Sequence, residues 1–135
     1  MSEYLYQESR INKNIIHLGK IDNAKLGLYY NAADLLCVPS KYEEGLGRVI
    51  LEALCCGLPV VASDKGGIPE VLNENIGILV EPKENDFYLA IERLYRDQAL
   101  RRKLSENALY YAKERFSDKN AKVITEAYRL SPCLS

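Results

Sequence analysis

Compact apolar runs alternate with stretches of helical periodicity along the first part of the chain. The runs occupy residues 14–19, 34–38, 58–62 and 77–80. Glycine or proline lies at one end of each run, and short, continuously apolar segments of this kind are typical of strands buried in a parallel sheet. Between the runs, residues 23–31 and 48–56 carry apolar side chains at helical spacing. The alternation predicts an α/β domain with a mostly parallel sheet.

The remaining pattern is helical. Apolar residues recur at spacings of three and four over residues 87–95, 100–111 and 123–128. A further short helix is predicted at residues 4–10, and Ser117 is a suitable N-cap for the last helix. The last part of the chain is therefore predicted to be helical.

Length and composition narrow the class of protein. The chain has 135 residues, 47% of them hydrophobic and 27% charged, which suits one globular domain. Its 18 basic and 19 acidic residues leave a net charge of -1, which speaks against bulk binding to nucleic acid or to an anionic membrane. No run is long and apolar enough to span a bilayer, and the first residues do not resemble a signal peptide. We expect a cytoplasmic protein without a transmembrane segment.

The four cysteines do not form a metal-binding pattern. Cys37, Cys55, Cys56 and Cys133 lack the short gaps that let two thiolates reach one zinc ion. We expect reduced thiols that fill the core, no metal and no cofactor.

A glycine-bearing loop follows the second apolar run and leads into a helix. Gly45 and Gly47 let backbone N–H groups approach a ligand closely, and the following helix N-terminus favours an anion such as pyrophosphate. Glu44 lies in the loop and Glu52 about a turn and a half inside the helix, so both can line one cleft. Because a carboxylate repels phosphate but accepts from hydroxyls, Glu52 suits a ribose diol and Glu44 a transferred sugar.

A second glycine-bearing turn follows the third apolar run. It contains Gly66 and Gly67 and precedes a predicted helix start at Pro69. In parallel sheets the carboxyl ends of neighbouring strands share one edge, where ligands bind. The two loops are therefore predicted to form the floor of one pocket.

Five sequence pieces together resemble the donor-site signature of the family 4 glycosyltransferases. They are Pro39-Ser40, Glu44-Gly45-Leu46-Gly47, Glu52-Ala53, Cys56-Gly57-Leu58-Pro59-Val60-Val61 and Gly66-Gly67-Ile68-Pro69-Glu70. Their order and gaps agree with the family pattern, and the similarity extends from about Ile15 to Phe116. The pairing of the two glutamates with the later glycine element is more specific than either alone.

The resemblance implies a Rossmann-like three-layer domain, the partial C-terminal half of a GT-B fold, which binds a nucleoside-diphosphate sugar. Residues 1–116 would form this truncated domain, residues 117–130 a C-terminal helix that packs on it or crosses from it, and residues 131–135 a tail. Family chemistry is hexosyl transfer with retention at the anomeric carbon and without a metal. The acceptor would bind another domain.

The resemblance also assigns roles to individual residues. Glu44 matches the catalytic carboxylate near the donor sugar, and Glu52 matches the ribose ligand. The backbone of Gly45, Leu46 and Gly47 would bind sugar and phosphate, and Gly66 and Gly67 are further donor-binding candidates. Arg48 is a candidate for charge neutralisation, as is Lys65, although neither matches the Arg and Lys that relatives bring to the pyrophosphate.

The family strand order, 3-2-1-4-5-6, has a consequence for the sheet. This sequence lacks counterparts of the first two strands, which leaves residues 14–19 without neighbours and exposes one edge of the strand at 34–38. We expect either that residues 14–19 dock directly on that edge or that the edge pairs in a homodimer or with a partner chain.

Other functions remain open from sequence alone. A non-catalytic nucleotide-sugar-binding or assembly module would keep the same loops. A sugar-nucleotide epimerase or sugar phosphorylase would need its own histidine or lysine set, which the single histidine disfavours. Exposed glutamates are usually only solvated, and Glu70 fits a helix dipole as well as a ligand.

Overall fold

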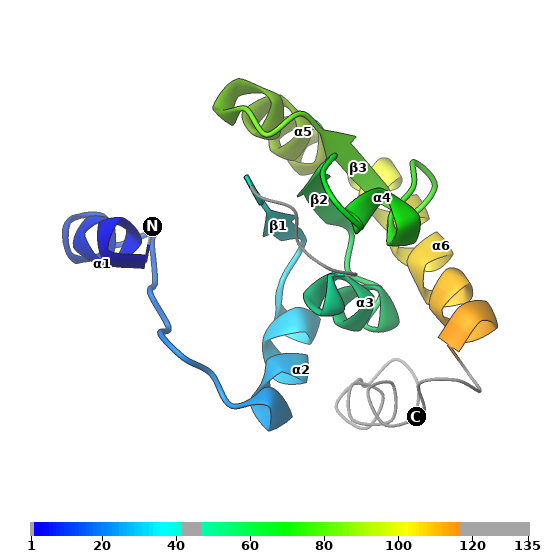
Figure 1. The fold of residues 1–135 in the computed structure, drawn as a ribbon, viewed down its shortest axis with the longest axis horizontal. Helices are drawn as coiled ribbons and strands as arrows, with labels where there is room; N and C mark the ends of the chain where they lie inside the picture. Colours follow the sequence, from blue (N-terminus) through cyan, green and yellow to red (C-terminus); the bar gives the residue numbers. More distant parts are fainter. Residues whose placement is uncertain (1, 42–46, 117–135) are drawn as a thin grey trace.

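Three parallel strands lie between helices in the computed structural model, which describes residues 2–41 and 47–116 (Figure 1). The strands are β1 (Leu36–Val38), β2 (Val60–Ser63) and β3 (Gly77–Val80), in the order β1-β2-β3. Leu36 pairs with Val60, and Val60 pairs with Gly77. The α/β prediction and the parallel sheet are confirmed.

Helices lie on both faces of the sheet, whereas α1 (Ser2–Ile11) lies apart from them (Figure 1). The other helices are α2 (Asn23–Ala32), α3 (Arg48–Cys55), α4 (Ile68–Val71), α5 (Glu84–Arg96) and α6 (Gln98–Phe116). Figure 1 shows α3 and α5 on opposite sides of the sheet. The side chains of β2 alternate accordingly, with Val60 and Ala62 packing in the core cluster of α2 and α3 and Val61 in that of α5. These helices and the sheet make the predicted three layers.

A glycine ends α3 and lets α6 approach it. Gly57 has φ +68°, a left-handed conformation that L side chains rarely adopt. A Cβ atom on Gly57 would lie 2.8 Å from Cγ of Leu109 on α6, which is closer than van der Waals contact allows. The predicted helix stop at Gly57 is confirmed, and the same glycine also sets the α3–α6 packing.

The prediction of a strand at residues 14–19 is wrong, because the structure has no strand there. Ile16 is 78% exposed and Leu18 49% exposed, although the apolar pattern suggested burial. A single strand has no partner for its backbone N–H and C=O groups, and within the described residues the sheet ends at β1. Direct docking of this segment on β1 is therefore not observed. Within the described residues, β1 has a free edge, as expected (Figure 1).

The last two divisions of the chain, residues 117–130 and 131–135, lie outside the described residues. No helix within 2–41 or 47–116 combines the length and apolarity needed to cross a membrane.

Gly57→Ala should destabilise the fold by about 2–5 kcal/mol, because the left-handed backbone costs roughly 1–2 kcal/mol and overpacking adds about 1–3 kcal/mol. Urea unfolding followed by circular dichroism measures the change. Gly19→Ala is the matched control, since Gly19 has φ +65° with nothing within 4 Å of the new Cβ. Equal losses of unfolding free energy in the two variants would contradict the α6 contact. The double variant Gly57→Ala/Leu109→Ala should lose less unfolding free energy than the sum of the two single variants, because the shorter side chain makes room for the new Cβ.

Candidate functional site

The predicted site residues within the described chain lie at the carboxyl edge of the sheet. Val38, at the end of β1, pairs with Ala62, so the segments that follow β1 and β2 leave the sheet side by side. Gly47, at the N-terminus of α3, belongs to the first segment, and Gly66 and Gly67 belong to the second. Glu44, Gly45 and Leu46 lie outside the described residues, so their predicted roles stay predictions.

Gly47 forms the N-cap of α3 in a left-handed conformation, with φ 60° and ψ 62°. Its carbonyl accepts hydrogen bonds from the N–H groups of Ile50 at 2.8 Å and Leu51 at 3.3 Å. Gly47 has no side chain that could cap the helix, and among the described residues no side-chain cap is present at this N-terminus. An uncapped helix N-terminus is a suitable site for an anion.

The turn after β2 is tight. The N–H of Asp64 bonds to the carbonyl of Val80 at 2.8 Å, which ties the turn to the end of β3. Gly66 has φ +53°, which explains the glycine at this position, whereas Gly67 has φ -81° and needs no special conformation. At Gly67 the absent side chain, and not the backbone angle, is the feature that suits close approach of a ligand.

Glu52 is the buried carboxylate of the site. The residue is 9% exposed and accepts two hydrogen bonds, from the Tyr30 hydroxyl to Oε2 at 3.0 Å and from Arg48 Nε to Oε1 at 2.9 Å. A buried charge without partners is strongly unfavourable, so these donors offset much of its desolvation. The interpretation of Glu52 as only a solvated surface residue is excluded by this burial.

Tyr30 was missed as a functional residue by sequence reasoning, which placed it only on the apolar stripe of its helix. It lies on α2, 8% exposed, and its hydroxyl reaches Glu52 on α3. Burial raises the pKa of Tyr30 far above its usual value, and the negative charge of Glu52 and its hydrogen bond raise it further. The phenol therefore stays protonated throughout the neutral range and donates a hydrogen bond to Glu52. The available signal was that a buried tyrosine hydroxyl needs a partner.

Arg48 lies one helical turn before Glu52 and pairs with it. The Arg48 side chain is 62% exposed, whereas that of Glu52 is 12% exposed, so the guanidinium covers the carboxylate from the solvent side. Arg48 had been considered as a charge for the pyrophosphate. In this structure its Nε bonds to Glu52, and within the described residues its other guanidinium nitrogens form no salt bridge with an acidic side chain.

The expectation that the cysteines fill the core is confirmed for Cys55 and wrong for Cys37, which is exposed on the edge strand β1, while Cys56 is partly buried. Cys55 is 1% exposed, and burial, with the neighbouring Cys56 and Glu52, raises its pKa to about 12. Burial and Glu52 likewise raise the pKa of Cys56 to about 11. Both thiols stay protonated at neutral pH and are poor nucleophiles, in agreement with the predicted core-filling role.

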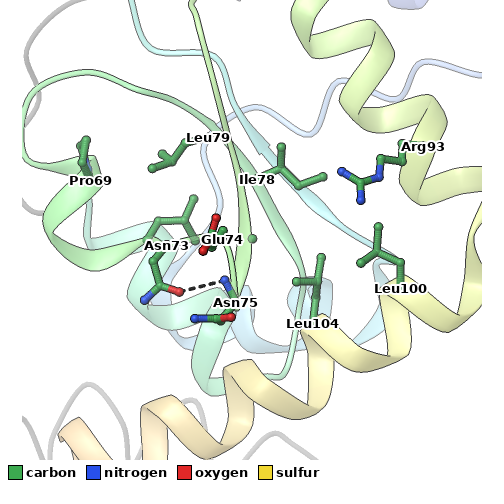
Figure 2. A pocket seen from close by; sticks show the side chains of 11 residues that line it. Pro69, Asn73, Glu74, Asn75, Ile78, Leu79, Arg93, Leu100 and Leu104 are labelled. Atoms are coloured by element: carbon green, nitrogen blue, oxygen red, sulfur yellow. Dashed lines mark hydrogen bonds between the residues drawn. The ribbon is translucent and has the colours of Figure 1, made fainter.

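A separate cavity of about 710 Å³ lies along the outer side of β3. Figure 2 shows Ile78 on β3 facing Arg93 on α5, with Leu100 and Leu104 below them on α6, and Asn73 and Asn75 near the amino end of β3. It contains neither Glu52 nor the glycines of the two loops. This cavity is therefore distinct from the candidate site at the carboxyl edge.

Comparisons with known proteins agree with this geometry. Residues 1–115 match the model of the family described as glycosyl transferases group 1. An uncharacterized glycosyltransferase of Methanocaldococcus jannaschii is 32% identical over 132 residues, which are 96% of this chain and 34% of that protein. A D-inositol 3-phosphate glycosyltransferase of Streptomyces bingchenggensis is 36% identical over 107 residues, 77% of this chain and 23% of that protein.

Solved structures of glycosyltransferases are also similar to this chain. Sucrose-phosphate synthase from Thermosynechococcus elongatus superposes with a TM-score of 0.75 at 37% identity, over 95% of this chain and 31% of that one. HepE of Anabaena in complex with UDP-glucose gives a TM-score of 0.65 at 26% identity, over 95% of this chain and 35% of that one.

The chain belongs to the glycosyl transferases group 1 family and forms part of a GT-B glycosyltransferase domain. It spans about a third or less of the length of each of these relatives.

Proposed function

We propose that this chain supplies the donor-binding side of a glycosyltransferase that uses a nucleoside-diphosphate sugar. The observation that carries the proposal is Glu52, a buried carboxylate on α3 about one turn from the N-terminus of that helix, where no side chain of the described residues provides a cap. A carboxylate accepts from ribose hydroxyls, and helix N–H groups donate to phosphate oxygens. The complexes of HepE with UDP and UDP-glucose support this ligand class.

Each part of the donor would meet a different group. Glu52 would accept from the ribose diol, and the N–H groups at Gly45, Leu46 and Gly47 would donate to the diphosphate and the sugar. Glu44 would act as the catalytic carboxylate beside the sugar, and Gly66 and Gly67 would admit the ligand without side-chain overlap. No metal is required, because backbone dipoles stabilise the diphosphate charge.

The proposed reaction is retaining hexosyl transfer. The bond between the anomeric carbon and the phosphate oxygen breaks, a bond to the acceptor oxygen forms on the same face, and the acceptor proton passes to the departing diphosphate. Preorganised N–H donors would stabilise the negative charge that develops on the leaving group. A cytoplasmic location is part of the proposal, supported by the free thiols of Cys37, Cys55 and Cys56.

Glu52→Ala should weaken the binding of UDP about 10- to 100-fold, because a charge-assisted hydrogen bond contributes about 1.5–3 kcal/mol. Calorimetric titration of the wild type and the variant with UDP, ADP and GDP measures the effect and identifies the base. Glu92→Ala is the matched control, since Glu92 also pairs with an arginine four residues away, Arg96, but lies on α5. Absence of binding to the wild type at millimolar nucleotide, or equal affinity in Glu52→Ala, would refute the donor site.

We further propose that the free edge of β1 pairs with a strand of another polypeptide or of a second copy of this chain. Leu36 donates its N–H to the carbonyl of Pro59 at 2.9 Å, toward β2. Because successive residues of a strand direct their backbone groups to opposite sides, the N–H and C=O of Cys37 face the free edge. Exposed Ile16 and Leu18 add apolar surface that a pairing partner would cover.

Cys37→Pro tests the edge pairing, because proline removes the outward N–H and leaves the β1–β2 hydrogen bonds of Leu36 and Val38 in place. Light scattering after size exclusion should show an associated wild type and a variant of lower mass. Cys37→Ser, which keeps the N–H, should associate like the wild type. A wild type that stays monomeric at all concentrations and binds no candidate partner would contradict the proposal.

A further inference from the structure

The phenol of Tyr30 and the guanidinium of Arg48 bind different oxygens of Glu52. Tyr30 donates to Oε2 and Arg48 to Oε1. An ionised carboxylate has about four lone-pair directions, two on each oxygen. Among the described residues, each oxygen of Glu52 therefore keeps one lone-pair direction without a donor. Two free acceptors on one rigid group match the two hydroxyl donors of a vicinal diol.

The two donors differ in how firmly they fix the carboxylate. Arg48 lies on the same helix as Glu52, and most of its side chain is exposed. Solvent therefore screens this ion pair, which holds the carboxylate only weakly. Tyr30 comes from another helix, 22 positions earlier in the chain, and its ring packs in the core with Ile50 and Leu54. Of the two, the buried phenol is the donor that restricts rotation of the carboxylate.

We infer that Tyr30 is a positioning residue that orients Glu52 and thereby gives the site its preference for ribose over 2′-deoxyribose. The inference rests on the proposed function, in which Glu52 receives the ribose. A neutral phenol suits this task because it orients the carboxylate and leaves its negative charge available to the diol. With the carboxylate fixed, loss of the 2′-hydroxyl leaves one acceptor unpaired, which a site built around hydrogen bonds penalises.

Removal of the phenol hydroxyl should relax this preference. In Tyr30→Phe the ring still fills the core, but the carboxylate can turn toward Arg48 or solvent, and the two free acceptors no longer have a fixed spacing. UDP loses affinity because its diol is no longer matched, whereas 2′-deoxy-UDP, which offers one hydroxyl, loses less. The ratio of the two affinities is therefore the quantity that reports positioning.

The experiment is calorimetric titration of the full chain with UDP and with 2′-deoxy-UDP. We expect the wild type to prefer UDP about tenfold and Tyr30→Phe to prefer it by about threefold or less. Tyr29→Phe is the matched control: Tyr29 is the neighbouring residue on α2, is 43% exposed, and should retain the wild-type ratio. Both affinities are measured on one preparation, so a partly unfolded variant lowers them equally and leaves the ratio unchanged.

The possible outcomes distinguish failure of the donor-site proposal from failure of the positioning role of Tyr30. A wild type that binds neither nucleotide at millimolar concentration refutes the donor site itself. If UDP binds but 2′-deoxy-UDP binds equally well, the inferred ribose preference is wrong. If the wild type discriminates and Tyr30→Phe keeps the full ratio, Tyr30 is only a packing residue and the positioning role is refuted.

Discussion

A buried negative charge needs compensation, and at Glu52 this requirement connects the two helices that form the site. The carboxylate is nearly enclosed, so it depends on the Tyr30 hydroxyl from α2 and on Arg48 from its own helix. Removal of either partner would leave a carboxylate oxygen without a donor. The same two contacts that make burial tolerable also fix the direction in which the remaining lone pairs point. In the proposed function, stability and ligand recognition would share one set of hydrogen bonds.

The site divides its tasks between backbone and side chain. Left-handed glycines at Gly47 and Gly66 shape the two turns, and no side chain of the described residues caps the start of α3. Backbone donors cannot distinguish one hydroxyl pattern from another, whereas an oriented carboxylate can. In the proposed function, phosphate affinity would come mainly from the helix N-terminus, and selectivity for the ribose from Glu52 with Tyr30. The cavity beside β3, lined by Arg93, lies outside this arrangement (Figure 2).

Sequence patterns correctly predicted the helices and strands that pack against other helices and strands of the described chain. The strand at residues 77–80, the helix from Arg48 and its stop at Gly57 were predicted and observed. The segment 14–19 was wrongly predicted to be a strand. An apolar run indicates that a segment tends to be buried, but a strand also needs a neighbouring strand for its backbone hydrogen bonds. In the described structure that neighbour is absent, and Ile16 and Leu18 remain exposed.

The candidate site could be predicted only in part. Glycine spacing and the two glutamates located the loops, because these features are local in sequence. Tyr30 could not be found in this way, since helical spacing explains its position and only the fold brings its hydroxyl to a carboxylate 22 residues later. The pairing of Arg48 with Glu52 follows the general preference for oppositely charged residues four apart, whereas a contact of Arg48 with diphosphate stays a prediction.

The most direct test is a crystal structure of the chain with UDP bound. We expect both ribose hydroxyls to lie at hydrogen-bond distance, about 2.5–3.0 Å, from the Glu52 carboxylate oxygens. The Tyr30 hydroxyl should keep its bond to Oε2, and the diphosphate should face the N-terminus of α3. A nucleotide bound in the cavity beside β3, or a ribose that does not contact Glu52, would contradict the assignment of this carboxylate as the ribose receptor.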